Sequence, residues 1–424
     1  MPGRQLFCGK NRMLAVFLSV SLVAFSRSHS GSSASASTSN RNRTDSTSSQ
    51  ELNDRESFAG DAACGSCHSA IANGYLRTAH HLTSQIPSEN SVTGKFAPGS
   101  NTLRTYDPNL HFVMTAAKGG YYETAVFWQP PDEQEQTERI DLVIGSGQRG
   151  QTYLYWKGDR LFQLPVSFWA PLSEWVNSPG YTDGTADFTR PVVPRCLECH
   201  ATHFTAIPSP PLNNRYRRDS GVLGISCERC HGPGREHVAL VKSRLSNAQS
   251  LPSNAAPVMA APENLKIVNP VNLPRERQIE VCAQCHGGLG EERAPAFSYT
   301  PGQPLESFLH LLRPDPSAKV DVHGNQVALL ERSRCFQNSS KITCNFCHDV
   351  HTTERAAASY SDRCLTCHKP ENCGMYPKLG AEIANNCIDC HMPVQDSNAI
   401  VSNVGGKQVK MQIRSHWIKI YSAQ

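Results

Sequence analysis

The pentapeptide Cys-x-x-Cys-His occurs seven times in this chain of 424 residues, and it limits the possible folds more than any other feature. The copies use fourteen of the 17 cysteines. We number them motifs 1 to 7 in chain order. Their cysteine pairs are Cys64 and Cys67, Cys196 and Cys199, Cys227 and Cys230, Cys282 and Cys285, Cys344 and Cys347, Cys364 and Cys367, and Cys387 and Cys390. The histidines that complete them are His68, His200, His231, His286, His348, His368 and His391.

The spacing of this motif has a chemical reason. Residues i, i+3 and i+4 share one face of a helical turn. Two thiols at i and i+3 can therefore attach to the two vinyl groups along one edge of a haem, while the imidazole at i+4 reaches the iron. This is the attachment pattern of c-type haem, with the histidine as proximal ligand. The sequence thus predicts seven covalently bound haem c groups.

Two other uses of paired cysteines explain the pattern less well. A zinc site built from paired Cys-x-x-Cys sequences needs no histidine after each pair, and seven pairs cannot be matched two by two. A redox disulfide between cysteines three apart is typical of a thioredoxin-like βαβ context, which this chain lacks.

A second set of histidines could supply the ligand on the other face of each iron. Outside the motifs and the N-terminal segment there are nine candidates, namely His80, His81, His111, His203, His237, His310, His323, His351 and His416. His203, His237 and His351 each follow a motif so closely that one iron could hardly bind both histidines from opposite faces. In "CNFCHDVH" we therefore expect His348 to serve the haem of its own motif and His351 to serve a neighbouring haem.

Several stretches resemble the exported multihaem cytochromes related to the cytochrome c-552/554 group. They are "GDAACGSCHSAIANGYLRTAHH", "SPGY", "ISCERCHGPGREHV", "EVCAQCHG", "CNFCHDVH" and "NCIDCHMP" with "IRSHWIKI", and the resemblance runs from about Phe58 to the C-terminus. It implies distal ligands at His80 or His81, His237, His351 and His416. His203 and His323 are further candidates, and His111 and His310 are reserves.

The resemblance also bears on activity. Nitrite reductases of the wider group carry a Cys-x-x-Cys-Lys motif at the catalytic haem, and this chain has none. Hydroxylamine-oxidising relatives cross-link a tyrosine to one haem, and the position of Tyr421 alone is poor support for that. We therefore expect an electron carrier between redox partner proteins. The alternative is an oxidoreductase that binds a small inorganic nitrogen or sulfur compound at one five-coordinate haem.

The N-terminus predicts the compartment. Three basic residues precede the apolar run "MLAVFLSVSLVAF", which is too short for a membrane span and fits a secretory signal peptide. We expect a signal peptide over residues 1–30 and a flexible Ser/Thr-rich linker over 31–56. The mature protein should be periplasmic or otherwise exported, without an integral membrane segment, although peripheral association with a membrane stays open.

Residues 57–424 should form the multihaem domain. Because only 18% of residues are charged, against about a quarter in ordinary domains, we expect stacked haems to fill much of the interior. The predicted fold is mainly α and loop-rich, with one small antiparallel β insert of four or five strands at about 100–170. Within it "GSGQRG" (145–150) should be a hairpin, because no helix follows to make a dinucleotide site.

The remaining cysteines and the net charge complete the expectations. Cys335 and Cys373 could form a disulfide in an oxidising compartment or stay as two thiols. The formal charge of +4 falls when the basic signal is removed, and each ferric haem adds about −1 through its propionates. The charge therefore gives no support for a nucleic-acid partner.

Overall fold

The structure is a computed structural model, and it describes residues 55–117, 119–249, 265–315, 317–354 and 356–421. These residues belong to one unit, Thr47–Gln424. The predicted signal peptide and nearly all of the predicted linker lie outside the described residues. Among the described residues, no helix has the length and apolar character needed to cross a membrane.

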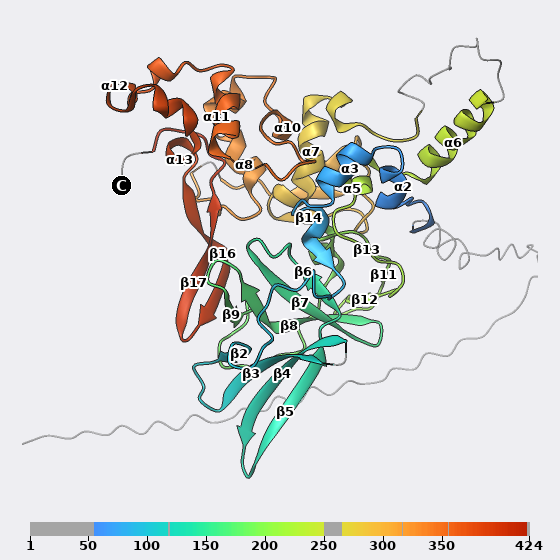
Figure 1. Cartoon of the computed structure of the whole chain (residues 1–424), viewed down its shortest axis with the longest axis vertical. Coiled ribbons are helices and arrows are strands. Elements are labelled where there is room, and N and C mark those ends of the chain that lie inside the picture. The colour runs from blue at the N-terminus through green and yellow to red at the C-terminus, as the bar shows by residue number, and fades with distance from the viewer. Residues whose placement is uncertain (1–54, 118, 250–264, 316, 355, 422–424) are drawn as a thin grey trace, which may run out of the picture. The chain divides into compact units, whose positions relative to one another are not determined.

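Most helices are short, and the motifs lie on them or at their ends (Figure 1). The α-helices are α2 (Asp61–Gly65), α3 (Ser69–Tyr75), α4 (Pro194–Glu198), α5 (Cys227–His231), α6 (Arg235–Gln249), α7 (Arg275–His286), α8 (Gln326–Glu331), α9 (Arg334–Gln337), α10 (Cys344–Cys347), α11 (Ala357–Leu365), α12 (Tyr376–Leu379) and α13 (Ile388–His391). The 3₁₀ turns are η1 (His81–Thr83), η3 (Pro270–Asn272), η4 (Leu305–Ser307), η5 (Pro370–Asn372) and η6 (Gly380–Asn385).

Glycine and proline explain why a motif helix can be so short. Gly232 follows α5 with φ +84°, a left-handed conformation that ends the helix and that residues with a Cβ rarely adopt. Pro233 comes next and cannot continue the helical hydrogen bonding. The sequence around motif 3 thus confines its helix to little more than one turn.

The prediction of a mainly α fold is wrong, because strands are as extensive as helices, at 27% and 28% of the described residues. The largest sheet has the order β1-β6-β7-β8-β12-β11, and β9 also pairs with β8. Its strands are β1 (Ser84–Gln85), β6 (Leu142–Ile144), β7 (Gly150–Lys157), β8 (Arg160–Trp169), β9 (Glu174–Asn177), β11 (Ala206–Ile207) and β12 (Arg215–Tyr216). The segment 145–150 leads from β6 into the antiparallel β7, as a hairpin requires.

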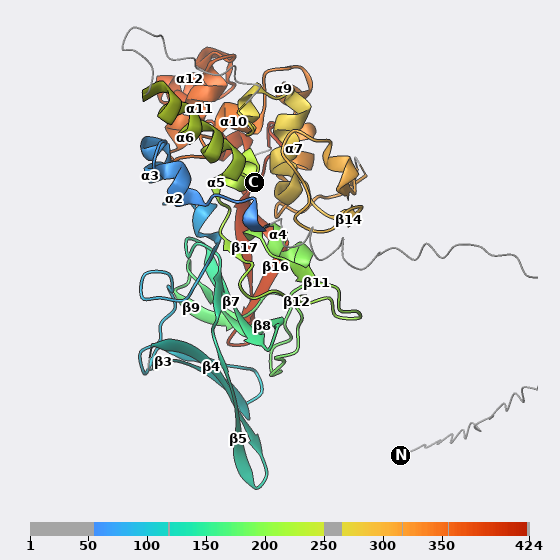
Figure 2. The ribbon, with the colours of Figure 1, turned by 90° about the vertical axis from the view of Figure 1, so that its right-hand side faces the viewer.

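A second sheet of four strands packs against the first. It has the order β2-β3-β4-β5, with β2 (Thr102–Arg104), β3 (Leu110–Ala117), β4 (Gly120–Gln129) and β5 (Asp132–Arg139). Leu110, Phe112 and Met114 alternate along β3 and point into a core shared with Val166 of β8 and Trp175 of β9. Figure 2 shows β3, β4 and β5 as a layer beyond β7 and β8, and β5 is exposed along most of its length.

Three two-stranded sheets complete the β structure. They are β10 (Ala201–His203) with β13 (Val222–Leu223), β14 (Gly290–Glu292) with β15 (Leu309–Leu311), and β16 (Val394–Val404) with β17 (Lys407–Arg414). Gly405 and Gly406 both have positive φ and form the two-residue turn between β16 and β17. Met411 of β17 packs with Trp169 and Val176, so this hairpin lies against the large sheet (Figure 1).

The predicted β insert was therefore too small. The described residues form eight strands between Thr102 and Asn177, in two sheets, and further strands occur between and after the later motifs. The prediction included only the segments that have long runs of aromatic and β-branched residues.

Candidate haem-binding sites

Each motif forms a helical turn of the kind that its spacing predicts. In motifs 1, 5, 6 and 7 the N–H of the histidine donates to the carbonyl of the first cysteine, at 2.9 to 3.0 Å. Motifs 3 and 4 lie within α5 and at the end of α7. In motif 2 the His200 N–H donates to the Leu197 carbonyl at 2.9 Å, which makes a tighter turn. The local geometry therefore fits a group held by two thiols and one imidazole.

No disulfide joins any of the described cysteines. Cys335 and Cys373 were expected either to form a disulfide or to stay as two thiols. In the structure they are two separate thiols. Cys335 interacts electrostatically with Cys347 of motif 5 and is the second residue of the short helix α9.

The thiols reveal which motifs are neighbours. Thiol–thiol interactions pair Cys64 with Cys227, Cys199 with Cys285, Cys282 with Cys344 and Cys364 with Cys387. Electrostatic interactions join Cys230 to Cys282 and Cys347 to Cys364. Motifs 1, 3, 4, 5, 6 and 7 therefore follow one another in space, and motif 2 lies beside motif 4.

Three pairs of histidine rings lie side by side at nearly the same separation. The ring centres of His231 and His351 are 6.2 Å apart with planes 22° from parallel. His348 and His416 are 6.1 Å apart at 29°, and His80 and His286 are 6.1 Å apart at 79°. Two imidazole nitrogens that bind one metal ion from opposite sides at about 2 Å put the ring centres about 6 Å apart. Each pair thus has the spacing of two axial ligands on one iron.

The two histidines of "CNFCHDVH" belong to different pairs. His348 faces His416, which follows β17, whereas His351 faces His231 of motif 3. The expectation that they serve different irons stays a prediction, and these ring contacts support it.

Several rings are oriented by a hydrogen bond at Nδ1. The carbonyls of Val268, Leu265 and Lys419 lie 2.8 to 2.9 Å from Nδ1 of His231, His237 and His391, respectively. Because a carbonyl can only accept a hydrogen bond, Nδ1 carries the proton in each neutral ring. Nε2 then keeps its lone pair, and such a bond holds a ligating imidazole in place.

Burial keeps several of these imidazoles uncharged. It lowers the pKa of His200 to about 4, and it lowers the pKa of His416 to about 4 as well. Only a neutral imidazole has a lone pair for a metal, so both rings are in the ligand form at neutral pH.

The other predicted ligands lie in varied surroundings. His323 is exposed and interacts electrostatically with His200 and His286. His203 is buried against Phe58 and Phe297, with ring centres 5.3 and 5.7 Å away. Among the ring contacts of the described residues, none joins His68, His200, His368 or His391 to a second imidazole.

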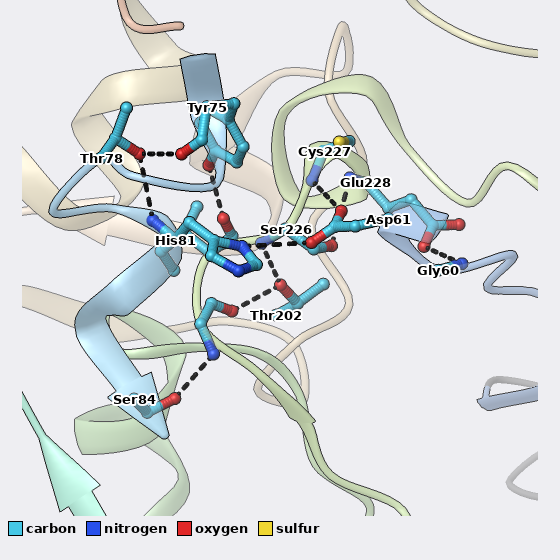
Figure 3. A network of polar contacts seen from close by, with 12 residues as sticks. Gly60, Asp61, Tyr75, Thr78, His81, Ser84, Thr202, Ser226, Cys227 and Glu228 are labelled. Atoms are coloured by element: carbon cyan, nitrogen blue, oxygen red, sulfur yellow. Dashed lines mark hydrogen bonds and ion pairs between the residues drawn. The ribbon is translucent and has the colours of Figure 1, made fainter. Parts of the chain in front are cut away.

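His81 and the two reserve histidines have other partners. His81 Nδ1 lies 3.2 Å from Asp61 Oδ2, and Asp61 Oδ1 accepts from the Cys227 N–H at 3.0 Å (Figure 3). His81 therefore belongs to a polar network that ties motif 1 to motif 3. The partly exposed His310 pairs with Glu306 at 2.9 Å, and His111 lies on β3 opposite Val126.

Sequence reasoning missed the residues between the two cysteines of a motif. Glu228 of motif 3 accepts from the N–H groups of Ala59, Gly60 and Gly234 at 2.7 to 2.9 Å, which anchors the segment before motif 1. Figure 3 shows the contact with Gly60. The charge of Glu228 could have indicated this role, because a residue between the two cysteines lies on the side of the helical turn that faces away from the haem.

The described side chains do not form a site for a bare metal ion. A structural zinc site takes four ligands from side chains such as cysteine and histidine. No group of three or more His, Cys, Asp or Glu side chains that could hold a metal ion occurs in the described part of the chain.

A segment of the chain matches a known family. Residues 178–232 match the family described as cytochrome c554 and c-prime, and this segment contains motifs 2 and 3. No curated protein and no solved structure matches the chain. The match covers a short part of the chain and supports a c-type cytochrome family, which implies covalently bound haem c.

Proposed function

We propose that this protein is a heptahaem c-type cytochrome that carries electrons between redox partner proteins outside the cytoplasm. The observation that carries the proposal is the set of three histidine pairs whose ring centres lie 6.1 to 6.2 Å apart. Each pair contains the histidine of one Cys-x-x-Cys-His motif. An iron with two imidazole ligands has no open position for a substrate, so it favours electron transfer over catalysis.

The chain's own residues would bind and orient the haems. The two cysteines of each motif would form thioethers, and the motif histidine would bind the iron from the proximal side. His351, His416 and His80 would bind the opposite sides in motifs 3, 5 and 4, as the three ring contacts support. Haem supplies the one-electron redox chemistry when it is bound.

The remaining distal ligands are proposed on less direct contacts. The electrostatic interaction of His323 with His200 supports His323 as the ligand for motif 2. The Nδ1 contact of His237 leaves its Nε2 available for an iron. His203 and His81 stay predicted ligands, although their recorded contacts are with aromatic rings and with Asp61, respectively.

The order of the motifs in space supports a relay. Thiols of successive motifs interact along the series 1, 3, 4, 5, 6 and 7, with motif 2 as a side branch at motif 4. Haems attached to neighbouring thiols would be close enough to exchange electrons. Motifs 1 and 7 lie at the two ends of the series, where donor and acceptor proteins would dock.

The compartment and the partners are part of the proposal. The basic N-terminus with its apolar run supports export by a signal peptide, and haem attachment of this type then occurs outside the cytoplasm. The partners would be redox proteins, and the chain gives no support for a nucleic-acid partner.

The test is the spin state of the purified ferric protein. We expect electron paramagnetic resonance to detect only low-spin haem, with optical spectra that do not change when cyanide or nitrite is added. A high-spin haem that binds either ligand would contradict the carrier function. That result would favour the oxidoreductase with one five-coordinate haem.

A further inference from the structure

A buried cluster of polar side chains joins three motifs through the residues between their cysteines. Glu198 lies between the cysteines of motif 2, Arg229 between those of motif 3 and Gln284 between those of motif 4. Arg195, which directly precedes motif 2, completes the group. We call these four residues the Glu198 cluster.

Glu198 is the centre of the contacts. Its Oε2 lies 3.0 Å from Arg195 Nη1, and its Oε1 lies 3.8 Å from Arg229 Nη2. Oε1 also accepts from the Phe297 N–H at 2.6 Å. The two arginines reach the neighbouring backbone as well, because Arg195 Nη2 donates to the Gln284 carbonyl at 2.9 Å and Arg229 Nη2 to the Glu198 carbonyl at 3.2 Å.

The cluster is shielded from water and carries unequal charge. The side chains of Arg229, Glu198 and Arg195 are 5%, 10% and 25% exposed. One carboxylate faces two guanidinium groups, so a single positive charge is left over. Charges act over longer distances and more strongly where water is excluded, because the local dielectric constant is lower.

The charges lie within electrostatic reach of the thiols of three motifs. Both arginines interact with Cys199 of motif 2 and with Cys285 of motif 4. Arg229 also interacts with Cys230 of motif 3. A haem attached to any of these three thiols would therefore lie close to the cluster.

We propose that the Glu198 cluster sets the reduction potentials of the haems bound by motifs 2, 3 and 4. Reduction adds one electron to a haem, so nearby positive charge favours the reduced form and nearby negative charge opposes it. Glu198 lowers the three potentials, and Arg195 and Arg229 raise them. This inference rests on the proposed function, because it requires haems at these motifs.

Charge-changing variants of the full holoprotein test the proposal through redox titration followed by optical spectroscopy. Glu198→Gln keeps the size of the side chain and removes its charge, so we expect up to three of the seven potentials to rise. Arg195→Gln should shift potentials in the opposite direction. The double variant should return them close to those of the unchanged protein.

A cluster that only supports packing would not give shifts of opposite sign that cancel in the double variant. If Glu198→Gln does not fold, Arg195→Gln still tests the proposal, because Arg195 is partly exposed. Unchanged potentials in Arg195→Gln, or shifts of the same sign in both single variants, would overturn it.

Asp389→Asn is the matched control, since Asp389 is the charged residue between the cysteines of motif 7. It pairs with Arg414 at 2.7 Å, but its side chain is 56% exposed, so water screens its charge. We expect at most a small shift, confined to the haem of motif 7. Haem content is measured in every variant by the pyridine haemochrome assay. Missing haem in the unchanged protein would refute the proposed function, whereas full haem content with unmoved potentials would refute only the role of the cluster.

Discussion

His348 and His416 face each other with ring centres 6.1 Å apart and planes 29° from parallel. His348 completes motif 5, and His416 lies two residues after the end of β17. The hairpin of β16 and β17 packs through Met411 on Trp169 and Val176 of the large sheet. The β structure therefore helps to place a candidate iron ligand, as well as forming a core of its own.

Removal of His416 should change the haem of motif 5 alone. In His416→Ala the iron bound by His348 loses its second imidazole, so we expect about one seventh of the haem to become high-spin and to bind cyanide. Electron paramagnetic resonance and optical titration measure this change. His310→Ala is the control, because His310 is partly exposed and pairs with Glu306. A low-spin spectrum that His416→Ala leaves unchanged would show that His416 is not a ligand.

Glu123 should make the stability depend on pH. Its side chain is fully buried at the core between the two large sheets, where Oε1 accepts from the Val166 N–H at 3.1 Å and Oε2 has no partner. Burial raises the pKa of this carboxyl well above its ordinary value. The folded protein therefore holds a proton that the unfolded chain releases above about pH 4.5. The free energy of unfolding therefore falls by about 1.4 kcal/mol per pH unit as pH rises from the pKa of Glu123 in the unfolded chain to its pKa in the folded protein.

Glu123→Gln should remove that dependence. The amide oxygen can still accept from Val166, and no proton is lost, so we expect the variant to gain stability over the unchanged protein as pH rises from 5 to 8. Denaturant unfolding of both proteins at several pH values measures the difference. Glu135→Gln on the exposed strand β5 should show no such gain. A constant difference between Glu123→Gln and the unchanged protein would mean that Glu123 is already ionised in the fold.

Damage to the core between the two large sheets should lower the stability of the fold without preventing haem attachment. Phe112 is fully buried there, so Phe112→Ala should cost about 3–5 kcal/mol of unfolding free energy and leave the haem content intact. Denaturant unfolding and the pyridine haemochrome assay measure the two effects. Trp128→Ala, on the same sheet but 51% exposed, should change the stability far less. Loss of haem from Phe112→Ala would contradict this separation.

Glu228 should hold the segment before motif 1 against motif 3. Glu228→Ala would leave the N–H groups of Ala59, Gly60 and Gly234 without their acceptor, at a cost of about 1–3 kcal/mol for each group that water cannot reach. We expect a lower denaturation midpoint and faster proteolysis close to Gly60. Glu228→Gln keeps an acceptor oxygen and should be affected less. Equal proteolysis rates in all three proteins would argue against this anchoring role.

The sequence was most informative where structure is local. The spacing of the motifs predicted one helical turn for each, and the backbone hydrogen bonds from His68, His348, His368 and His391 to the first cysteines form such turns. The turn at Gly405 and Gly406 was equally readable, because two glycines between strand-like runs favour a two-residue hairpin. The prediction of a mainly α fold with one β insert did not include this hairpin.

Contacts between distant segments could not be read in this way. The two-residue strand Arg215–Tyr216 exists because it pairs with Arg160 of β8, and so short a segment has no period of its own. Glu198 and Arg229 likewise meet only because motifs 2 and 3 pack together. The ring of His80 lies beside that of His286, whereas His81 pairs with Asp61. Which of the two histidines approaches a motif depends on how the segment after α3 is placed, and that placement could not be predicted from the sequence.

The most direct test of the account is the mass of the purified, denatured protein compared with that of its processed chain. Thioether bonds survive denaturation, so we predict an excess equal to seven haem groups, with a pyridine haemochrome value of seven haems per chain. A mass equal to that of the bare chain, or a colourless protein, would contradict the central claim.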